Sequence, residues 1–169
     1  MRRYADASPD LLRQLPALDE LEEQFLGTVN GAGGHWKFAV CLRDIPAGNV
    51  AVRMRGMRVG WCSYWVAAEC RGRGLASTAL SSLAAFAFEE LDAFRLKLAH
   101  RLDNPASGAV ARAAGFAPEG IMRAELEYDG VRYDTRMWSR LRTDPAPAAA
   151  FPRIPSEGHD VARHTSRNG

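Results

Sequence analysis

Long apolar runs are absent from this 169-residue sequence, and no stretch approaches the ~18 apolar residues that a membrane-spanning helix needs. The first residues, Met1 to Asp6, also lack the apolar segment of a secretion signal. We therefore expect a cytoplasmic protein without a membrane partner. The apolar content of 47% and charged content of 25% are ordinary for one globular domain.

Cysteine and histidine are scarce as well. The three cysteines, Cys41, Cys62 and Cys70, form no CxxC pair and leave an odd count, which is typical of reduced thiols. Cys41 and Cys62 lie in strand-like segments and are predicted to be small core residues, whereas Cys70 is predicted to be a loop residue. The four histidines are scattered without ligand spacing, so no metal site is predicted.

The sequence also lacks a strong excess of charge of one sign. The net charge is +2, the isoelectric point is near 8.6, and no basic run is interleaved with aromatic residues. Nucleic acid is therefore not an expected partner.

The apolar pattern predicts a mixed α/β (α+β) domain. Residues 10–30 have helical spacing interrupted at Pro16, which indicates two short helices. Residues 143–169 carry no periodic pattern and are predicted to be a disordered tail. Between them we expect strands at 36–43, 49–55 and 58–67, a helix at 75–90, a strand at 94–100, a helix from 105 to about 114, and strands at 121–128 and 131–140.

Turn residues mark several element boundaries. A turn around Pro46–Gly48 is predicted to join the first two strands, and Asp129-Gly130 is a strong hairpin signal between the last two. Asn104-Pro105 suits the start of a helix, and Gly115 suits its end. The helix at 75–90 is predicted to turn one stripe of four residues to the core: Leu80, Leu83, Ala84 and Ala87.

The segment 65–76 is the most informative part of the chain. An apolar strand enters the turn Arg71-Gly72-Arg73-Gly74, and the next helix begins at Leu75-Ala76. The glycines let the backbone approach an anion, and the first helical amides have no intrahelical partner. The two arginines add positive charge. These residues predict a cradle for the pyrophosphate of a phosphate-bearing cofactor.

A dinucleotide-binding protein is one alternative for such a turn. There the glycine turn follows the first strand of a parallel βαβ unit, with an acidic residue ~20 positions later. Here antiparallel strand patterns come first, so the order of elements argues against it.

The turn resembles the acyl-CoA signature of the GNAT N-acetyltransferases, (Gln/Arg)-x-x-Gly-x-(Gly/Ala), with Arg71, Gly74 and Ala76 at its specified positions. Downstream, Asn104-Pro105-Ala106-Ser107 is similar to the family's Asn-x-x-Ser. Gly115-Phe116 followed by Glu119-Gly120 is similar to its Gly-Phe-x-x-Glu-Gly, and the Asp129-Gly130 hairpin with Asp134 resembles its closing strands. The resemblance covers 36–141 and is greatest to the RimJ/RimL branch, which includes ribosomal-protein N-terminal acetyltransferases.

The resemblance implies a mostly antiparallel, twisted sheet flanked by helices over residues 1–142. It implies acetyl-CoA as co-substrate and direct attack by an amine acceptor in a ternary complex. RimJ/RimL-like chains usually open with a strand and a helix ahead of the material seen here, so we expect the family's first strand to be absent. The open sheet edge that this leaves makes a homodimer an expected assembly.

The resemblance also assigns roles to individual residues. The amides of Val66 and Ala67 are expected to hold and polarise the thioester, in a slot formed where their strand splays from the strand at 94–100. Asn104 is expected to contact the pantetheine amides and Ser107 to donate to the leaving sulfur, although both residue types are common helix caps. The pyrophosphate role falls on six consecutive residues: Arg71, Gly72, Arg73, Gly74, Leu75 and Ala76.

The general base is less well specified. Glu125 and Glu127 lie two apart and are predicted to share one face of a strand, with Tyr128 on the other, and Glu125 is the candidate base. Trp61, Tyr64 and Trp65 are predicted to be core residues. The remaining carboxylates near the expected cleft are Glu69, Glu119 and Asp134.

Two functions stay open from the sequence. The first is an N-acetyltransferase acting on a protein N-terminal α-amine or a small-molecule amine. The alternative is a non-catalytic acyl-CoA-binding module, serving as a sensor or partner subunit on the same fold.

Overall fold

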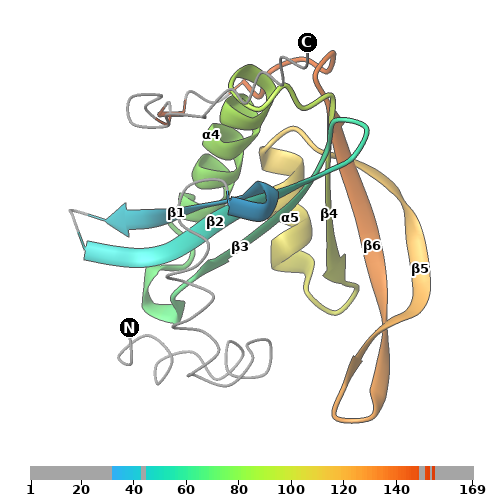
Figure 1. Ribbon diagram of the computed structural model, residues 1–169. Helices are drawn as coiled ribbons and strands as arrows, with labels where there is room; N and C mark the ends of the chain where they lie inside the picture. The colour runs from blue at the N-terminus through green and yellow to red at the C-terminus, as the bar shows by residue number, and fades with distance from the viewer. Residues whose placement is uncertain (1–31, 43–44, 149–150, 153, 155–169) are drawn as a thin grey trace.

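The computed structural model describes residues 32–42, 45–148, 151–152 and 154 (Figure 1). The two helices predicted within residues 10–30 and the question of the family's first strand lie outside these residues. Of the tail predicted over residues 143–169, residues 149–150, 153 and 155–169 also lie outside them, whereas residues 143–148, 151–152 and 154 are described. The elements are η1 Ala32–Gly34, β1 His35–Leu42, β2 Ile45–Arg55, β3 Val59–Val66, η2 Ala68–Cys70, α4 Leu75–Glu89, β4 Arg95–Arg101, α5 Pro105–Ala113, β5 Ala117–Tyr128 and β6 Val131–Leu141.

The described strands form one six-stranded sheet in the order β1-β2-β3-β4-β6-β5. β3 and β4 run parallel, and every other neighbouring pair is antiparallel. The predicted mixed α/β fold with a mostly antiparallel sheet is therefore confirmed. No helix in the described part of the chain is long and apolar enough to cross a membrane.

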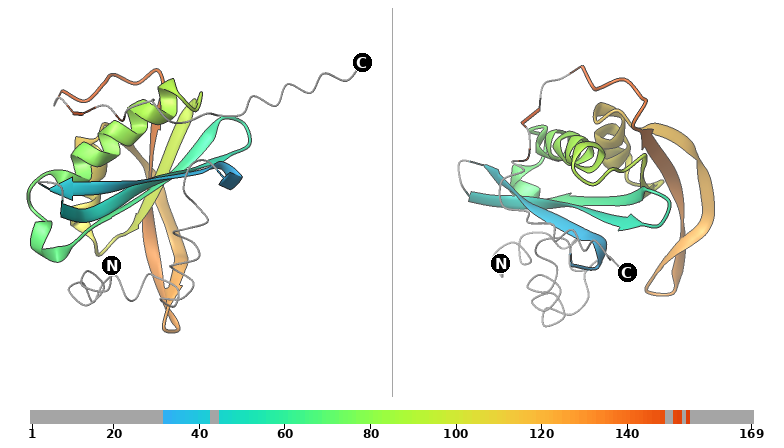
Figure 2. Two further views of the ribbon diagram at one scale, coloured as in Figure 1. Left: turned by 60° about the vertical axis from the view of Figure 1, so that its left-hand side comes forward. Right: turned by 45° about the horizontal axis from the view of Figure 1, so that its top comes forward.

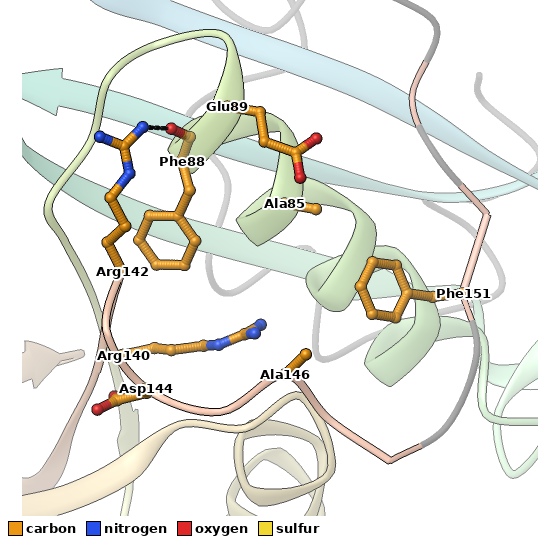
Figure 3. A pocket seen from close by; sticks show the side chains of 8 residues that line it. All are labelled: Ala85, Phe88, Glu89, Arg140, Arg142, Asp144, Ala146 and Phe151. Atoms are coloured by element: carbon orange, nitrogen blue, oxygen red, sulfur yellow. Dashed lines mark hydrogen bonds between the residues drawn. The ribbon is translucent and has the colours of Figure 1, made fainter.

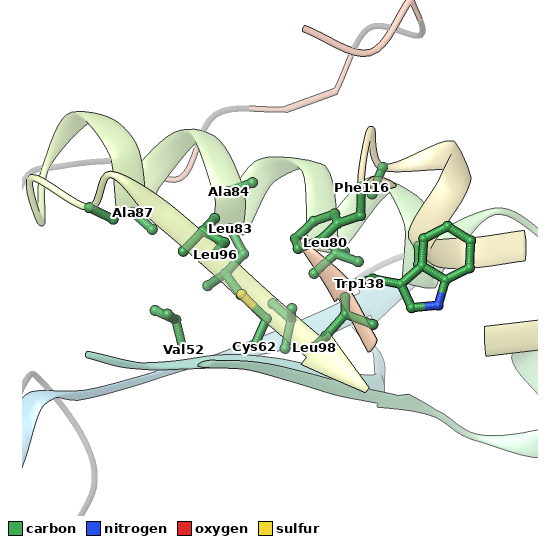
Figure 4. Packing of buried hydrophobic residues seen from close by; sticks show 14 of the residues in the cluster. Val52, Cys62, Leu80, Leu83, Ala84, Ala87, Leu96, Leu98, Phe116 and Trp138 are labelled. Atoms are coloured by element: carbon green, nitrogen blue, oxygen red, sulfur yellow. The ribbon is translucent and has the colours of Figure 1, made fainter. Parts of the chain in front are cut away.

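Helices α4 and α5 lie on the same face of the sheet, and the core fills the space beneath them (Figure 2). The predicted stripe of α4, from Leu80 to Ala87, is fully buried. It packs on the alternate residues of the strands that point to the helices (Figure 4), namely Val52, Cys62, Leu96, Leu98 and Trp138. Burial of an aliphatic side chain contributes roughly 1.5–3 kcal/mol, so this layer is the main support of the site.

The closing hairpin forms where the sequence predicts it. Asp129 and Gly130 join β5 to β6 with φ angles of 51° and 76°. Two consecutive positive φ values define the tight turn that matches the twist of antiparallel strands, and Asp-Gly supplies them with little strain.

The first hairpin differs from the prediction. β2 begins at Ile45, and Pro46 already pairs with Cys41 of β1. The predicted turn at Pro46–Gly48 is therefore wrong. The connection between the two strands falls on residues 43–44, which are not described. Pairing of β2 with β3 begins only at Gly48. Pro46 therefore lies where β2 has a single neighbour, and its missing N–H is tolerated there.

One cysteine prediction is also wrong. Cys62 is buried in the core as expected, but Cys41 is exposed. Val40, its neighbour in β1, points to the helices, and alternation along the strand turns Cys41 to the opposite face.

Candidate functional site

Parallel strands β3 and β4 separate along their length. They pair only at Val59–Arg95, Gly60–Leu96 and Trp61–Lys97, although β4 continues beside β6 to Arg101. From Cys62 to Val66, β3 therefore pairs with β2 alone. The predicted splay of the two strands is confirmed, and it leaves β3 with backbone groups facing the gap.

The alternation of the β2–β3 ladder decides which backbone groups face that gap. Ala67 N–H donates to the Ala47 carbonyl at 2.8 Å, so its amide is occupied and the expected polarising role of Ala67 is wrong. Bonded and non-bonded pairs alternate in an antiparallel ladder. The N–H of Val66, opposite Gly48, therefore points away from β2 and toward the splay.

The turn after β3 has the backbone geometry that a close approach requires. Gly72 and Gly74 have φ angles of 75° and 74°, in the left-handed region that favours glycine. A Cβ at Gly72 would meet nothing within 4 Å, and one at Gly74 would meet only Ser77 Oγ at 4.0 Å. Open space therefore lies beside both glycines.

The N-terminus of α4 opens onto this turn. Its N-cap is Gly74, and no side chain caps the helix. The amides of Leu75, Ala76 and Ser77 precede the first intrahelical bond, which runs from Thr78 N to the Gly74 carbonyl at 3.0 Å. Three amides and the positive end of the helix dipole thus converge on the space beside the glycines.

The two arginines of the turn behave differently. Arg71 folds back toward β3, where its Nε donates to the Val66 carbonyl at 3.1 Å. Arg73 is exposed. The contact of Arg71 joins the turn to the end of the splayed strand, so the predicted phosphate and thioester residues form one continuous surface.

The start of α5 lies across the splay. Asn104 is its N-cap, and its Oδ1 accepts from Ser107 N at 3.2 Å, which is the capping alternative noted from the sequence. The Ser107 carbonyl accepts from the Tyr64 hydroxyl at 3.1 Å. No hydrogen bond of Ser107 Oγ is recorded among the described residues, so both backbone groups of Ser107 are fixed while its hydroxyl is not.

Tyr64 is a site residue that sequence reasoning missed. It packs against the core as predicted, but its hydroxyl also bridges β3 and α5 across the splay. Burial raises the pKa of Tyr64, which keeps the phenol protonated as the donor of this bond. The signal was its place in β3, two residues after core-facing Cys62 and therefore on the helix side.

His100 is a second missed residue. It lies near the end of β4, where Nδ1 is 2.7 Å from the Arg101 carbonyl. Because a carbonyl only accepts, Nδ1 carries the proton of this hydrogen bond. Nε2 is buried and has no hydrogen-bond partner. It lies against Gly108 of α5, where a Cβ would stand only 3.0 Å from it.

Three of the candidate carboxylates are fixed by structural contacts. Glu119 accepts from Arg95 at 2.5 Å and from Ser139 at 2.7 Å, and the Arg95 hydrogen bond lowers the pKa of its carboxyl. Glu127 pairs with Arg132 at 2.6 Å. Asp134 accepts the amide of Ala124 at 2.8 Å. The lowered pKa makes Glu119 a weak proton acceptor.

A bulge in β5 corrects the predicted placement of Glu125. Pairing shifts between Met122 and Leu126, and Ala124 has a φ of 51°. Thr135 Oγ1 donates to the Glu125 carboxylate at 2.9 Å, whereas Glu127 pairs with Arg132, three positions from Thr135. Residues three apart on β6 point to opposite faces, so Glu125 and Glu127 do not share a face. Tyr128, 6.0 Å from Tyr133 between ring centroids, lies on the Glu125 side.

Metal ligands are not gathered in this region. Within the described ranges, no three His, Cys, Asp or Glu side chains are placed to hold one ion.

Comparison with known proteins identifies the family of this chain. Residues 2–117 match the family model of the acetyltransferase (GNAT) domain. A protein named as a ribosomal N-acetyltransferase, YdaF of Bacillus subtilis (strain 168), is 35% identical over 81 residues. That match covers 48% of this chain and 44% of YdaF, so the chain spans less than half the length of this curated relative.

Two solved structures share the fold. The ribosomal L7/L12 α-N-protein acetyltransferase RimL in complex with coenzyme A has a TM-score of 0.70 at 23% identity, covering 82% of this chain and 81% of RimL. Spermidine N-acetyltransferase from Vibrio cholerae, in complex with CoA and spermine, has a TM-score of 0.68 at 21% identity, covering 77% and 78%. The chain therefore belongs to the GNAT acetyltransferase family, with the RimJ/RimL-like branch represented among its relatives.

Proposed function

We propose that this protein transfers the acetyl group of acetyl-CoA to a primary amine by direct attack in a ternary complex. The splay of β3 from β4, directly beside the Gly72–Gly74 turn and the start of α5, is the observation that carries the proposal. The RimL and spermidine N-acetyltransferase structures that share this fold hold CoA.

The residues of the turn fit a pyrophosphate. Gly72 and Gly74 leave open space at their Cα atoms, and the uncapped amides of Leu75 and Ala76 face it. Arg71 and Arg73 supply positive charge on the same turn. We assign the pyrophosphate to these six residues, 71–76, and the pantetheine arm to the splay, where Asn104 lines the opposite side.

The acetyl group would then lie beside the end of β3. Val66 N–H points into the splay and would donate to the thioester carbonyl oxygen as negative charge develops there. The backbone N–H and carbonyl of Ser107 are held by Asn104 and Tyr64. The Ser107 hydroxyl would donate to the departing sulfur. No covalent enzyme intermediate is needed for this reaction.

The attacking amine must lose a proton, and we propose Glu125 as the acceptor of it. Its carboxylate is exposed and not ion-paired within the described residues, in contrast to Glu119 and Glu127. Thr135, whose hydroxyl donates to Glu125, lies opposite Arg101 in the β4–β6 ladder. Arg101 is at the end of β4, where the splay is widest. A water-mediated transfer to Glu125 is compatible with this placement.

For the acceptor we propose a protein N-terminal α-amine, with a small-molecule amine as the competing class. RimL and YdaF are named for ribosomal substrates, while the Vibrio cholerae structure contains spermine. The decisive experiment measures thiol release from acetyl-CoA against peptides with free N-termini, polyamines and aminoglycosides.

Thiol release that depends on one amine class would support the proposal and identify the acceptor. Binding of acetyl-CoA without release for any amine would favour the non-catalytic acyl-CoA-binding module instead. Stabilisation by NAD, with none by acetyl-CoA or CoA in a melting experiment, would contradict both.

A further inference from the structure

The bulge in β5 interrupts the ladder with β6. Pairing stops after Met122 and resumes at Leu126. Between these two points lie residues 123–125 on β5 but only Asp134 on β6. β5 is the last strand in the sheet order, so its outer edge has no neighbouring strand among the described elements. The backbone groups of the bulge therefore need partners other than the ladder.

Ala124, in the middle of the bulge, contacts two side chains of β6. Its N–H donates to Asp134 Oδ1 at 2.8 Å, and its carbonyl accepts from Arg132 Nη1 at 3.3 Å. Its φ of 51° lies in the left-handed region, which is unfavourable for alanine because of its Cβ. Water could satisfy both groups at this exposed position, but only the side chains of β6 tie them to a fixed point of the sheet.

The conformation of Ala124 decides where Glu125 points. Met122 shares a face of the sheet with its partner Thr135, so strict alternation along β5 would turn Glu125 to the opposite face. Thr135 Oγ1 nevertheless donates to the Glu125 carboxylate at 2.9 Å, so the bulge has reversed this direction. Re-aiming a side chain is a known use of bulges, and a strained residue that its surroundings hold in place is often part of a functional site.

We propose that Asp134 is a positioning residue that acts through Glu125. Its carboxylate holds Ala124 in the left-handed conformation, and this presents the Glu125 carboxylate beside Thr135, level with the end of β4 where the splay is widest. The proposal rests on the assignment of Glu125 as the acceptor of the amine proton. Asp134 itself contacts no proposed reacting atom.

Two substitutions of Asp134 separate its hydrogen bond from its charge. Asp134→Ala removes the acceptor of the Ala124 N–H, whereas Asp134→Asn keeps an oxygen that accepts. Measured with the amine that gives the most thiol release, kcat of Asp134→Ala should fall about tenfold, a part of the usual loss when a general base is removed. The KM for acetyl-CoA should not change, because the turn after β3 and the splay are untouched. Asp134→Asn should stay within about threefold of the wild type.

A double variant shows whether Asp134 acts through Glu125. Glu125→Gln removes the base, so adding Asp134→Ala to it should lower kcat no further. A further fall in the double variant would show that Asp134 acts by another route. Wild-type turnover in Asp134→Ala, or in Glu125→Gln, would show that one of the two residues has no such role. Each of these results would overturn the proposal.

Asp144→Ala is the matched control. Oδ2 of Asp144 also accepts a backbone amide at 2.8 Å, that of Leu141 at the far end of β6, roughly 24 Å along the strand from Asp134. Asp144 lines a pocket beside Arg140 and α4 there, away from the bulge (Figure 3). The Asp144→Ala variant should keep the wild-type kcat. A fall as large as that of Asp134→Ala would overturn the proposal, because the loss would then not be specific to the bulge.

Hydrogen exchange of the Ala124 amide, followed by NMR on the full chain, tests the contact with Asp134 without turnover. Exchange should be about tenfold faster in Asp134→Ala than in the wild type, as expected for the loss of one charge-assisted hydrogen bond. Equal exchange in the two proteins would overturn the proposal. If the wild type released no thiol with any amine, the acetyl-transfer function would fail, and this measurement would by itself decide whether Asp134 holds the bulge.

Discussion

The hydroxyl of Tyr64 donates a hydrogen bond to the carbonyl of Ser107 at 3.1 Å, and this contact joins β3 to α5 where β3 has already left β4. The strand that supplies the Val66 amide and the helix that supplies the Ser107 hydroxyl are therefore held at a fixed separation. Tyr64 contacts no proposed reacting atom, so it acts as a positioning residue.

Tyr64→Phe should test that role. The ring stays in the core while one partly buried hydrogen bond is lost, so we expect about 1 kcal/mol less unfolding free energy. The KM for acetyl-CoA should rise several-fold, because the slot loses its fixed width. Tyr128→Phe is the control, since no hydrogen bond of its hydroxyl is recorded among the described residues. Unchanged kinetics of the Tyr64 variant would remove it from the site.

Ser107→Ala is an unusually clean test of the leaving-group donor. The contacts of Ser107 with Asn104 and Tyr64 use its backbone, so the variant removes only the hydroxyl. We expect kcat to fall about 100-fold, within the usual range for a proton donor, with the affinity for acetyl-CoA unchanged. Wild-type turnover in this variant would exclude Ser107 from the mechanism.

The contact between Glu119 and Arg95 should make the stability of the protein depend on pH. The Arg95 hydrogen bond lowers the folded-state pKa of this carboxyl below its ordinary value of 4.5. Its contribution is therefore complete above about pH 5 and is lost as the pH falls through the lowered pKa. Both partners are about one-third exposed, so the contribution should stay below about 1 kcal/mol.

Urea unfolding of the wild type and of Glu119→Gln, compared from about pH 7 to about pH 3, measures this contribution. The difference in unfolding free energy should shrink as the pH falls. A difference that stays constant over this pH range would show that the contact with Arg95 does not lower the pKa of Glu119.

The cysteines should differ in reactivity. Burial raises the pKa of Cys62 to about 12, whereas Cys41 is exposed. Because the thiolate is the nucleophile, iodoacetamide should modify Cys41 in the native protein and Cys62 only after unfolding. Peptide mass spectrometry of samples labelled with and without urea would decide, and rapid native labelling of Cys62 would contradict the packing under α4.

Local chemistry made much of the fold predictable. The Asp129-Gly130 hairpin and the stripe from Leu80 to Ala87 depend on turn propensity and helical period, and both were confirmed. The start of β2 was missed because Pro46 is a turn residue by propensity, and only the partner strand shows that it pairs on one side.

The site was harder to predict where tertiary geometry decides. Ala124 is not a residue type that favours positive φ, so nothing in the sequence indicated the bulge that separates the faces of Glu125 and Glu127. Occupation of the Ala67 amide depends on the register with Ala47, which a single sequence does not specify. Tyr64 was placed correctly in the core, but its bond to Ser107 requires knowledge of the splay.

Isothermal titration calorimetry tests most directly whether the turn after β3 binds acetyl-CoA. The wild type should bind acetyl-CoA. Gly74→Asp should abolish binding, because it places a side chain and a negative charge in the open space beside the α4 amides. Gly56→Asp is the matched control, at a turn with open space and no positive φ, and should bind as the wild type does. Binding of acetyl-CoA to Gly74→Asp with wild-type affinity would show that the turn after β3 is not the acetyl-CoA site.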